Sequence, residues 1–193
     1  MSANDNVKRS VVLEFLSNIS SSRLFWIISF SLLTAVSAQI AIPVKPVPFT
    51  LQTMMVLLSG AFLGSKNGAY SQILYIFLGS IGLPVFANGS LGIAVLFGPT
   101  GGYLLAFPVA AFVIGYLIEI NKNYLNVVIS MFIGSLIIIA VGVLFLNFIF
   151  INNFLEALRA GGAVFTVWMV IKVFAAASIY FGISKKYSKL PGN

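Results

Sequence analysis

The chain contains no cysteine, no histidine and only four acidic residues, and charged residues make up 8% of its 193 positions. The absence of cysteine excludes disulfides, thiol catalysis and cysteine-ligated metal sites. Without histidine, and with so few carboxylates, the side chains that usually carry acid–base catalysis or bind metals are scarce. A membrane enzyme acting on a lipid or isoprenoid is therefore disfavoured, since it would need histidine, paired carboxylates or an acidic metal cluster.

Hydrophobic residues are correspondingly abundant and make up 60% of the chain, against about 45–50% in soluble domains. A hydrocarbon core about 30 Å thick is crossed by roughly 20 apolar residues in helical form. About six such stretches follow one another in this sequence. We therefore expect an all-α integral membrane protein, a bundle of six transmembrane helices forming a single membrane domain over residues 1–193.

The predicted helices lie within about residues 24–183. Their expected bounds are about 24–42, 51–63, 69–83, 103–120, 124–151 and 163–183. Residues 1–20 are expected to be a cytoplasmic segment, either a surface helix or a tail, and residues 184–193 a basic cytoplasmic tail. Residues 35–38 resemble a signal-peptidase site, but the long apolar stretch and the spans that follow favour an uncleaved first helix.

The second and third predicted helices are short, and glycines recur between and around them. Gly60, Gly64 and Gly68 are spaced four residues apart. This small-residue spacing allows helix backbones to approach closely in lipid. It predicts tight packing where the two short helices meet.

The basic residues predict the orientation, because cytoplasmic connections of membrane proteins carry an excess of lysine and arginine. Those in alternate connections on one side are Lys8, Arg9, Arg23, Lys66, Lys122, Lys185, Lys186 and Lys189. The opposite connections hold only Lys45 and Arg159. We expect both termini in the cytoplasm, and we interpret the net charge of +7 as a topology signal, not as a nucleic-acid surface.

Lys172 is the one basic residue left over, and it stands among otherwise uncharged residues from 163 to 182. A lysine at the centre of a membrane helix costs about 2.5–3.5 kcal/mol on insertion scales. Its ammonium would have to extend about 13 Å to reach the outer interface, which disfavours snorkelling. An ion pair is the other structural explanation, but none of the acidic residues maps to mid-membrane: Asp5, Glu14, Glu119 and Glu156. We therefore predict an anionic ligand as its partner.

The outer connection IPVKPVPFTLQT, residues 42–53, contains prolines at 43, 46 and 48. Because Pro43, Pro46 and Pro48 fix φ and disfavour a helix, they predict a stiff, extended strap. Thr50, Gln52 and Thr53 follow at the mouth of the next helix and can offer hydrogen bonds. Ligand contact and ordinary helix capping by Thr50 both remain open.

A second outer segment, residues 83–107, is rich in glycine, proline and small polar residues. Phe86 and Tyr103 supply flat apolar faces, whereas Asn88 and Thr100 supply an amide and a hydroxyl, a combination typical of a small-molecule site. No lysine follows the glycines as in a phosphate-binding loop. Any work driven by ATP must therefore come from another polypeptide.

The first helix carries small residues at Ser31, Ala35 and Ala38. A small-residue stripe supports close helix packing, either inside the bundle or against a partner. Sequence alone leaves both alternatives open.

Three motifs, PVPFTLQT, LGSIGLPVF and GPTGGYL, occur in this order within about residues 35–119. In sequence and spacing they resemble the BioY family, the biotin-specific substrate-binding (S) components of energy-coupling factor (ECF) vitamin transporters.

The resemblance implies a six-helix S component, not an enzyme, in a prokaryotic cell membrane. It would take up biotin as its transported ligand and dock on a transmembrane coupling subunit with two ABC ATPases. The matching docking positions are Ser31, Ala35 and Ala38, and the strap at residues 43–53 would act as a gate.

One position departs from the family pattern: Met169 stands where the family has an aspartate, three residues before Lys172. The change is compatible with altered affinity, a relocated hydrogen bond or another acidic vitamin such as lipoate. A stand-alone secondary transporter is a further alternative, disfavoured because no intramembrane carboxylate is present to couple protons. The predicted substrate-binding residues are Lys172, Asn88, Gln52, Thr50, Phe86, Tyr103, Thr100 and Met169.

Overall fold

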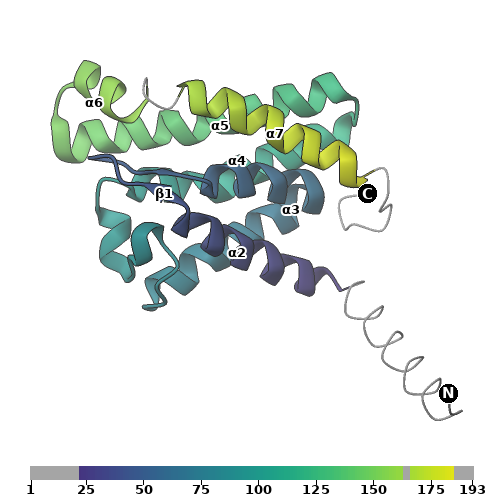
Figure 1. The fold of residues 1–193 in the computed structure, drawn as a ribbon, viewed down its shortest axis with the longest axis horizontal. Coiled ribbons are helices and arrows are strands. Elements are labelled where there is room, and N and C mark those ends of the chain that lie inside the picture. Colours follow the sequence, from purple (N-terminus) through teal and green to yellow (C-terminus); the bar gives the residue numbers. More distant parts are fainter. Residues whose placement is uncertain (1–21, 163–165, 185–193) are drawn as a thin grey trace, which may run out of the picture.

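A computed structural model describes residues 22–162 and 166–184, which form a helical bundle (Figure 1). The helices are α2 (Arg23–Gln39), α3 (Gln52–Ser80), α4 (Gly101–Ile120), α5 (Tyr124–Leu146), α6 (Phe154–Gly161) and α7 (Thr166–Ser184). The shorter elements are strands β1 (Ala41–Ile42) and β2 (Phe49–Thr50), the 3₁₀ helices η1 (Ala87–Gly89) and η2 (Ile93–Phe97), and the π-helical turn η3 (Asn147–Ile151).

Two antiparallel helices make up α3, joined at Gly64. This residue has φ 75° and ψ −178°, a conformation outside the helical region that glycine adopts without a steric penalty. A Cβ added to Gly68 would lie 2.9 Å from the Cα of Gly60, so the two helices touch at their glycines. The apolar stretches thus predicted the two short helices, and the spacing of the glycines predicted a close approach of helix backbones.

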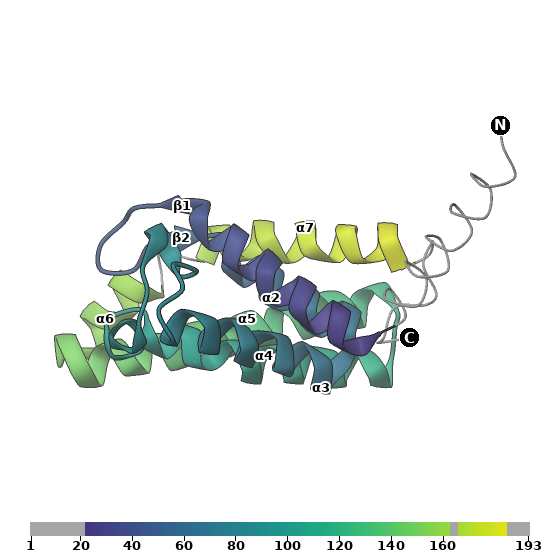
Figure 2. The same cartoon turned by 90° about the horizontal axis from the view of Figure 1, so that it is seen from below.

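Figure 2 shows α7 on one side of α4 and α5, while α2 runs obliquely from beside β1 toward the level of α3. β1, β2, α6 and the loop with η1 and η2 gather at one end of the bundle, which we call the loop end. The start of α2 and the end of α7 lie at the opposite end. A ligand site built from the two predicted outer segments would therefore belong to the loop end.

Three of the described helices are long and apolar enough to cross a membrane: α4, α5 continued by η3, and α7. α2 is a shorter apolar helix. The two parts of α3, residues 52–63 and 65–80, span about 18 and 24 Å, less than a hydrocarbon core. A mainly helical protein with several apolar helices is confirmed, whereas the six-span count stays a prediction.

Besides shifts of two or three residues at the ends of α3 and α4, three further differences separate the structure from the expectation. The first helix ends at Gln39, because Ala41 and Ile42 pair with Thr50 and Phe49 in an antiparallel ladder. The third predicted helix begins at residue 65 instead of 69, directly after the Gly64 turn. The short helix α6 was not predicted. The expectations for residues 1–20, 163–165 and 185–193 fall outside the described residues.

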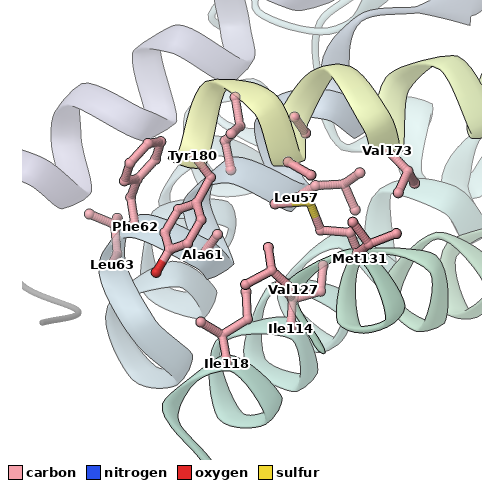
Figure 3. Packing of buried hydrophobic residues seen from close by; sticks show 14 of the residues in the cluster. Leu57, Ala61, Phe62, Leu63, Ile114, Ile118, Val127, Met131, Val173 and Tyr180 are labelled. Atoms are coloured by element: carbon pink, nitrogen blue, oxygen red, sulfur yellow. The ribbon is translucent and has the colours of Figure 1, made fainter. Parts of the chain in front are cut away.

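The apolar core consists of two clusters. The first includes Leu57, Ile114, Met131 and Tyr180, which meet between α3, α4, α5 and α7 (Figure 3). The second includes Tyr75, Phe86, Tyr103, Phe107 and Ile138. Because it contains residues of the loop between α3 and α4, this second cluster surrounds the candidate site.

Candidate ligand-binding site

A cavity of about 200 Å³ is lined by residues of β2, α3, α4, α5, α7 and the connections at the loop end. All the residues predicted to bind substrate line it: Thr50, Gln52, Phe86, Asn88, Thr100, Tyr103, Met169 and Lys172. Sequence reasoning missed Val47, Leu57, Ala87, Ser90, Val95, Leu104, Phe107, Ser135, Ile138 and Ile139. The walls are mainly apolar with a few polar groups, as in sites for small organic molecules.

Lys172 brings a buried ammonium to this cavity, with its side chain 8% exposed. Its Nζ donates to the backbone carbonyl of Thr50 at 2.7 Å and to Oγ1 of Thr53 at 2.9 Å. An ammonium has three donors, so these two contacts leave one for a ligand.

The acidic residues of the described segments contribute no carboxylate to Lys172. Glu119, near the end of α4, accepts hydrogen bonds from the backbone N–H and hydroxyl of Ser65 at the Gly64 turn. Glu156 lies in the first turn of α6. The charge of Lys172 is therefore met by neutral oxygens alone within the part of the chain that the structure describes.

A chain of hydrogen bonds runs from the strap to the loop between α3 and α4. The hydroxyl of Thr50 donates to Oε1 of Gln52 at 2.8 Å, and Nε2 of Gln52 donates to the hydroxyl of Tyr75. Tyr75 in turn donates to the carbonyl of Val85 at 3.1 Å. Because Lys172 contacts the carbonyl of Thr50, these hydrogen bonds connect α7 to the loop that precedes Phe86.

The hydroxyl of Thr50 has a local role as well, since it accepts from the backbone N–H of Gln52 at 3.3 Å. Leu51, which precedes α3, supplies no side-chain cap. Thr50 therefore both caps the start of α3 and lines the cavity.

Phe86 forms an apolar wall and is 1% exposed. Its ring meets that of Tyr75 edge to face, with centroids 5.6 Å apart. A Cβ on Gly79 would lie 2.1 Å from Cζ of Phe86, so the ring fits only because residue 79 has no side chain. Tyr75 and Gly79 therefore fix the position of Phe86, although neither lines the cavity.

Asn88 and Thr100, the two polar candidate residues of the second outer segment, lie in different backbone elements. Asn88 adopts a left-handed conformation, with φ 56° and ψ 32°, in η1. Thr100 precedes α4, where its side chain makes no capping hydrogen bond. Tyr103, on the first turn of α4, donates from its hydroxyl to the carbonyl of Gly161 at 2.8 Å and so joins α4 to α6.

The proline strap is closed by the β1–β2 pair, with Ala41 opposite Thr50. Of its three prolines, Pro48 lines the cavity, whereas Pro43 and Pro46 do not. Val47, between the last two prolines, is 5% exposed and also lines the cavity. The end of the strap is thus one wall of the site.

The small residues of α2 lie inside the bundle. Ser31, Ala35 and Ala38 are 0%, 8% and 0% exposed, and Thr34 on the same helix accepts a hydrogen bond from Nε2 of Gln72 in α3. Their small size allows α2 to pack closely on α3. This arrangement indicates internal packing within the described bundle. The docking of a partner on these three positions stays a prediction.

A search of known proteins finds relatives along most of the chain. It is 44% identical to a biotin transporter BioY from Thermotoga maritima over 156 residues, which cover 81% of this chain and 92% of that one. It is 42% identical to a probable biotin transporter BioY from Lysinibacillus sphaericus, covering 81% and 80% of the two chains. Both are named as transporters, in agreement with the expectation that the chain is not an enzyme.

A solved structure shows the same fold. This is a crystal structure described as the S-component for biotin from an ECF-type ABC transporter, with a TM-score of 0.80 and 27% identity, covering 96% of this chain and 95% of that one. The BioY family model matches residues 8–189. The chain therefore belongs to the BioY family.

Proposed function

We propose that this chain is the membrane-embedded, biotin-binding S component of an ECF-type importer. The observation that carries the proposal is the buried ammonium of Lys172 in a largely apolar cavity, 2.7 Å from the carbonyl of Thr50. Biotin has a compact bicyclic head and a carboxylate at the end of an aliphatic chain. Such a molecule matches a cavity that offers apolar walls and one cation. The relatives named as biotin transporters support the same substrate.

In this proposal Lys172 neutralises the carboxylate of the ligand with its remaining donor. Phe86 and Tyr103 pack against the apolar parts, while Asn88, Thr100 and the amide of Gln52 offer hydrogen bonds to the polar atoms of the head. Met169, one turn before Lys172, adds a flexible apolar surface where the family has an acid. A flexible thioether fills irregular gaps well.

The strap is proposed as the gate of the site. Its prolines restrict the backbone, its strands pair at Thr50, and Val47 and Pro48 face the cavity. A ligand that binds the ammonium of Lys172 would thereby affect the strap, because Thr50 and Thr53 already accept hydrogen bonds from that ammonium.

The proposed topology has six spans with both termini on the cytoplasmic side of a prokaryotic cell membrane. The start of α2 and the end of α7 lie at the same end of the bundle, and the basic residues predict that this end is cytoplasmic. A separate coupling subunit and two ABC ATPases would supply the energy for import, since the sequence lacks the lysine of a phosphate-binding loop. Ser31, Ala35 and Ala38 of α2 remain the proposed docking positions for that subunit, because small side chains allow helices to approach closely.

The test is calorimetry of the purified full chain in detergent with biotin and, separately, with lipoate. Tight binding of biotin and weak binding of lipoate is the expected result. Preference for lipoate would mean that Met169 marks a changed specificity within the same fold. Absence of heat with biotin, in protein shown to be folded by its thermal transition, would overturn the substrate assignment.

A further inference from the structure

Gln39, the last residue of α2, forms hydrogen bonds with the loop that contains Asn88. Nε2 of Gln39 donates to the carbonyl of Phe86 at 3.1 Å, and Oε1 accepts from the backbone N–H of Gly89 at 3.0 Å. Both ends of one amide thus bind the backbone on either side of Asn88. Nε2 also lies 3.3 Å from the carbonyl of Ala35, one turn back in the same helix, which orients the side chain.

The loop between these contacts has an unfavourable backbone conformation. Asn88 is left-handed, with φ 56°. Asparagine tolerates this region better than most residues, but the conformation persists only when surrounding contacts fix it. The turn is closed locally by a hydrogen bond from the N–H of Phe86 to the carbonyl of Ser90, at 3.1 Å. Gln39 ties this turn to α2, whereas Tyr75 and Gly79 of α3 hold the ring of Phe86 at its start.

α2 is in turn fixed to the bundle along its buried face. Ala38, next to Gln39, is 0% exposed. Thr34, one turn earlier, accepts from Gln72 of α3 at 3.3 Å. The hydrogen bonds of Gln39 therefore position the loop relative to α2, and a displacement of α2 would act on the backbone beside Asn88 through them.

We propose that Gln39 is a positioning residue that holds Asn88 at the cavity and couples ligand affinity to the position of α2. Gln39 is absent from the residues that line the cavity, so it acts through the loop and not by contact with ligand. The proposal rests on the proposed function for its ligand, biotin. The two hydrogen bonds of Gln39 to the loop, which we call the clamp, do not depend on that assignment.

The first experiment measures the clamp without ligand, by hydrogen–deuterium exchange of the full chain and of Gln39→Leu. Leucine is similar in size and lacks both hydrogen-bonding groups. We expect the amide of Gly89 to exchange about tenfold faster in the variant, the equivalent of about one net hydrogen bond. Unchanged exchange at Gly89 would overturn the proposal whatever the ligand is.

The second experiment measures biotin affinity and release rate for Gln39→Leu and Gln39→Glu. Leucine should weaken binding about tenfold, mainly through faster release. Glutamate keeps an acceptor for Gly89 but places a carboxylate oxygen against the carbonyls of Phe86 and Ala35, so it should also weaken binding. Ser29→Ala is the matched control, because it removes a side-chain hydrogen bond within α2, to the carbonyl of Phe25, and touches no loop.

A double variant of Gln39 and Asn88 distinguishes a positioning role of Gln39 from a general loss of structure. In an Asn88→Ala background, Gln39→Leu should cause no further loss of affinity, because the group that it positions is gone. Independent, additive losses in the double variant would overturn the positioning role. If the unaltered chain fails to bind biotin while Gly89 exchange responds as expected, the substrate assignment is wrong and the clamp stands.

Discussion

The ammonium of Lys172 donates a 2.7 Å hydrogen bond to the carbonyl of Thr50, 122 positions earlier in the chain. This contact joins the last helix to the end of the proline strap. It also explains how a lysine is accommodated in the apolar interior of the protein, since Thr50 and Thr53 both accept from it. The same ammonium therefore stabilises the contact between α7 and the strap and supplies the positive charge of the candidate site. Substitution can separate these two roles.

Replacement of Lys172 by methionine removes the charge while keeping most of the side-chain length. We expect folded protein with little change in stability, because the cost of burying the ammonium, about 2.5–3.5 kcal/mol, disappears together with its hydrogen bonds. Biotin affinity should fall about 100-fold, the usual effect of removing one partner of a buried charge pair. Thermal unfolding and calorimetry measure the two effects, with the exposed Lys66→Met as control.

Two buried tyrosines offer a matched comparison. Tyr75→Phe breaks the hydrogen-bond chain from Gln52 to Val85 at its centre. We expect biotin affinity to fall about tenfold, because Gln52 and the loop at Val85 each lose a hydrogen bond that orients them. Tyr180→Phe, in the cluster away from the loop end, should leave affinity unchanged. Equal affinities for the two variants, measured by calorimetry, would contradict the proposed role of the chain of hydrogen bonds.

Gly79 leaves the space that the ring of Phe86 fills. In Gly79→Ala the new methyl group would lie 2.1 Å from Cζ of Phe86, so the ring must move. We expect a loss of about 1–3 kcal/mol in unfolding free energy, as in other overpacked sites, together with weaker biotin binding. Gly182→Ala is the control, since nothing lies within 4 Å of its added Cβ. Retention of wild-type affinity by Gly79→Ala would show that Phe86 is not a wall of the occupied site.

The buried glutamines Gln52 and Gln72 are expected to have different roles: Gln52 in ligand binding and Gln72 in the stability of helix packing. Nε2 of Gln72 donates to Ser59 at 3.1 Å and to Thr34 at 3.3 Å, away from the cavity. Gln72→Met should therefore reduce stability by about 0.6–1.7 kcal/mol, typical of hydrogen bonds between membrane helices, and leave biotin affinity intact. Gln52→Met should weaken binding, because Gln52 lines the cavity. A larger loss of affinity from Gln72→Met than from Gln52→Met would reverse this assignment.

The sequence predicted the parts of the site that depend on unusual residue types. A lysine in an apolar helix, clustered prolines and a polar, glycine-rich segment each signal a departure from ordinary membrane helices. Lys172, Thr50 and Asn88 were identified in this way, and all line the cavity. The spacing of Gly60 and Gly68 likewise predicted their contact.

Other features leave no such signal in the sequence. Ser135, Ile138 and Ile139 line the cavity from the middle of a predominantly apolar helix, where the sequence pattern does not distinguish a cavity wall from a lipid-facing surface. The orientation of Ala35 and Ala38 was ambiguous because small residues serve internal and external packing equally. Gln39 and Tyr75 form hydrogen bonds with backbone groups 50 and 10 positions away, which only the fold brings together.

The most direct test compares biotin with its neutral methyl ester, on the unaltered chain and on Lys172→Ala, by calorimetry. If Lys172 pairs with the carboxylate, the unaltered chain should prefer biotin by about 100-fold, and the variant should bind both ligands with equal, weak affinity. Equal binding of acid and ester by the unaltered chain would contradict the pairing. A preference for biotin that survives in Lys172→Ala would assign the carboxylate to another part of the site.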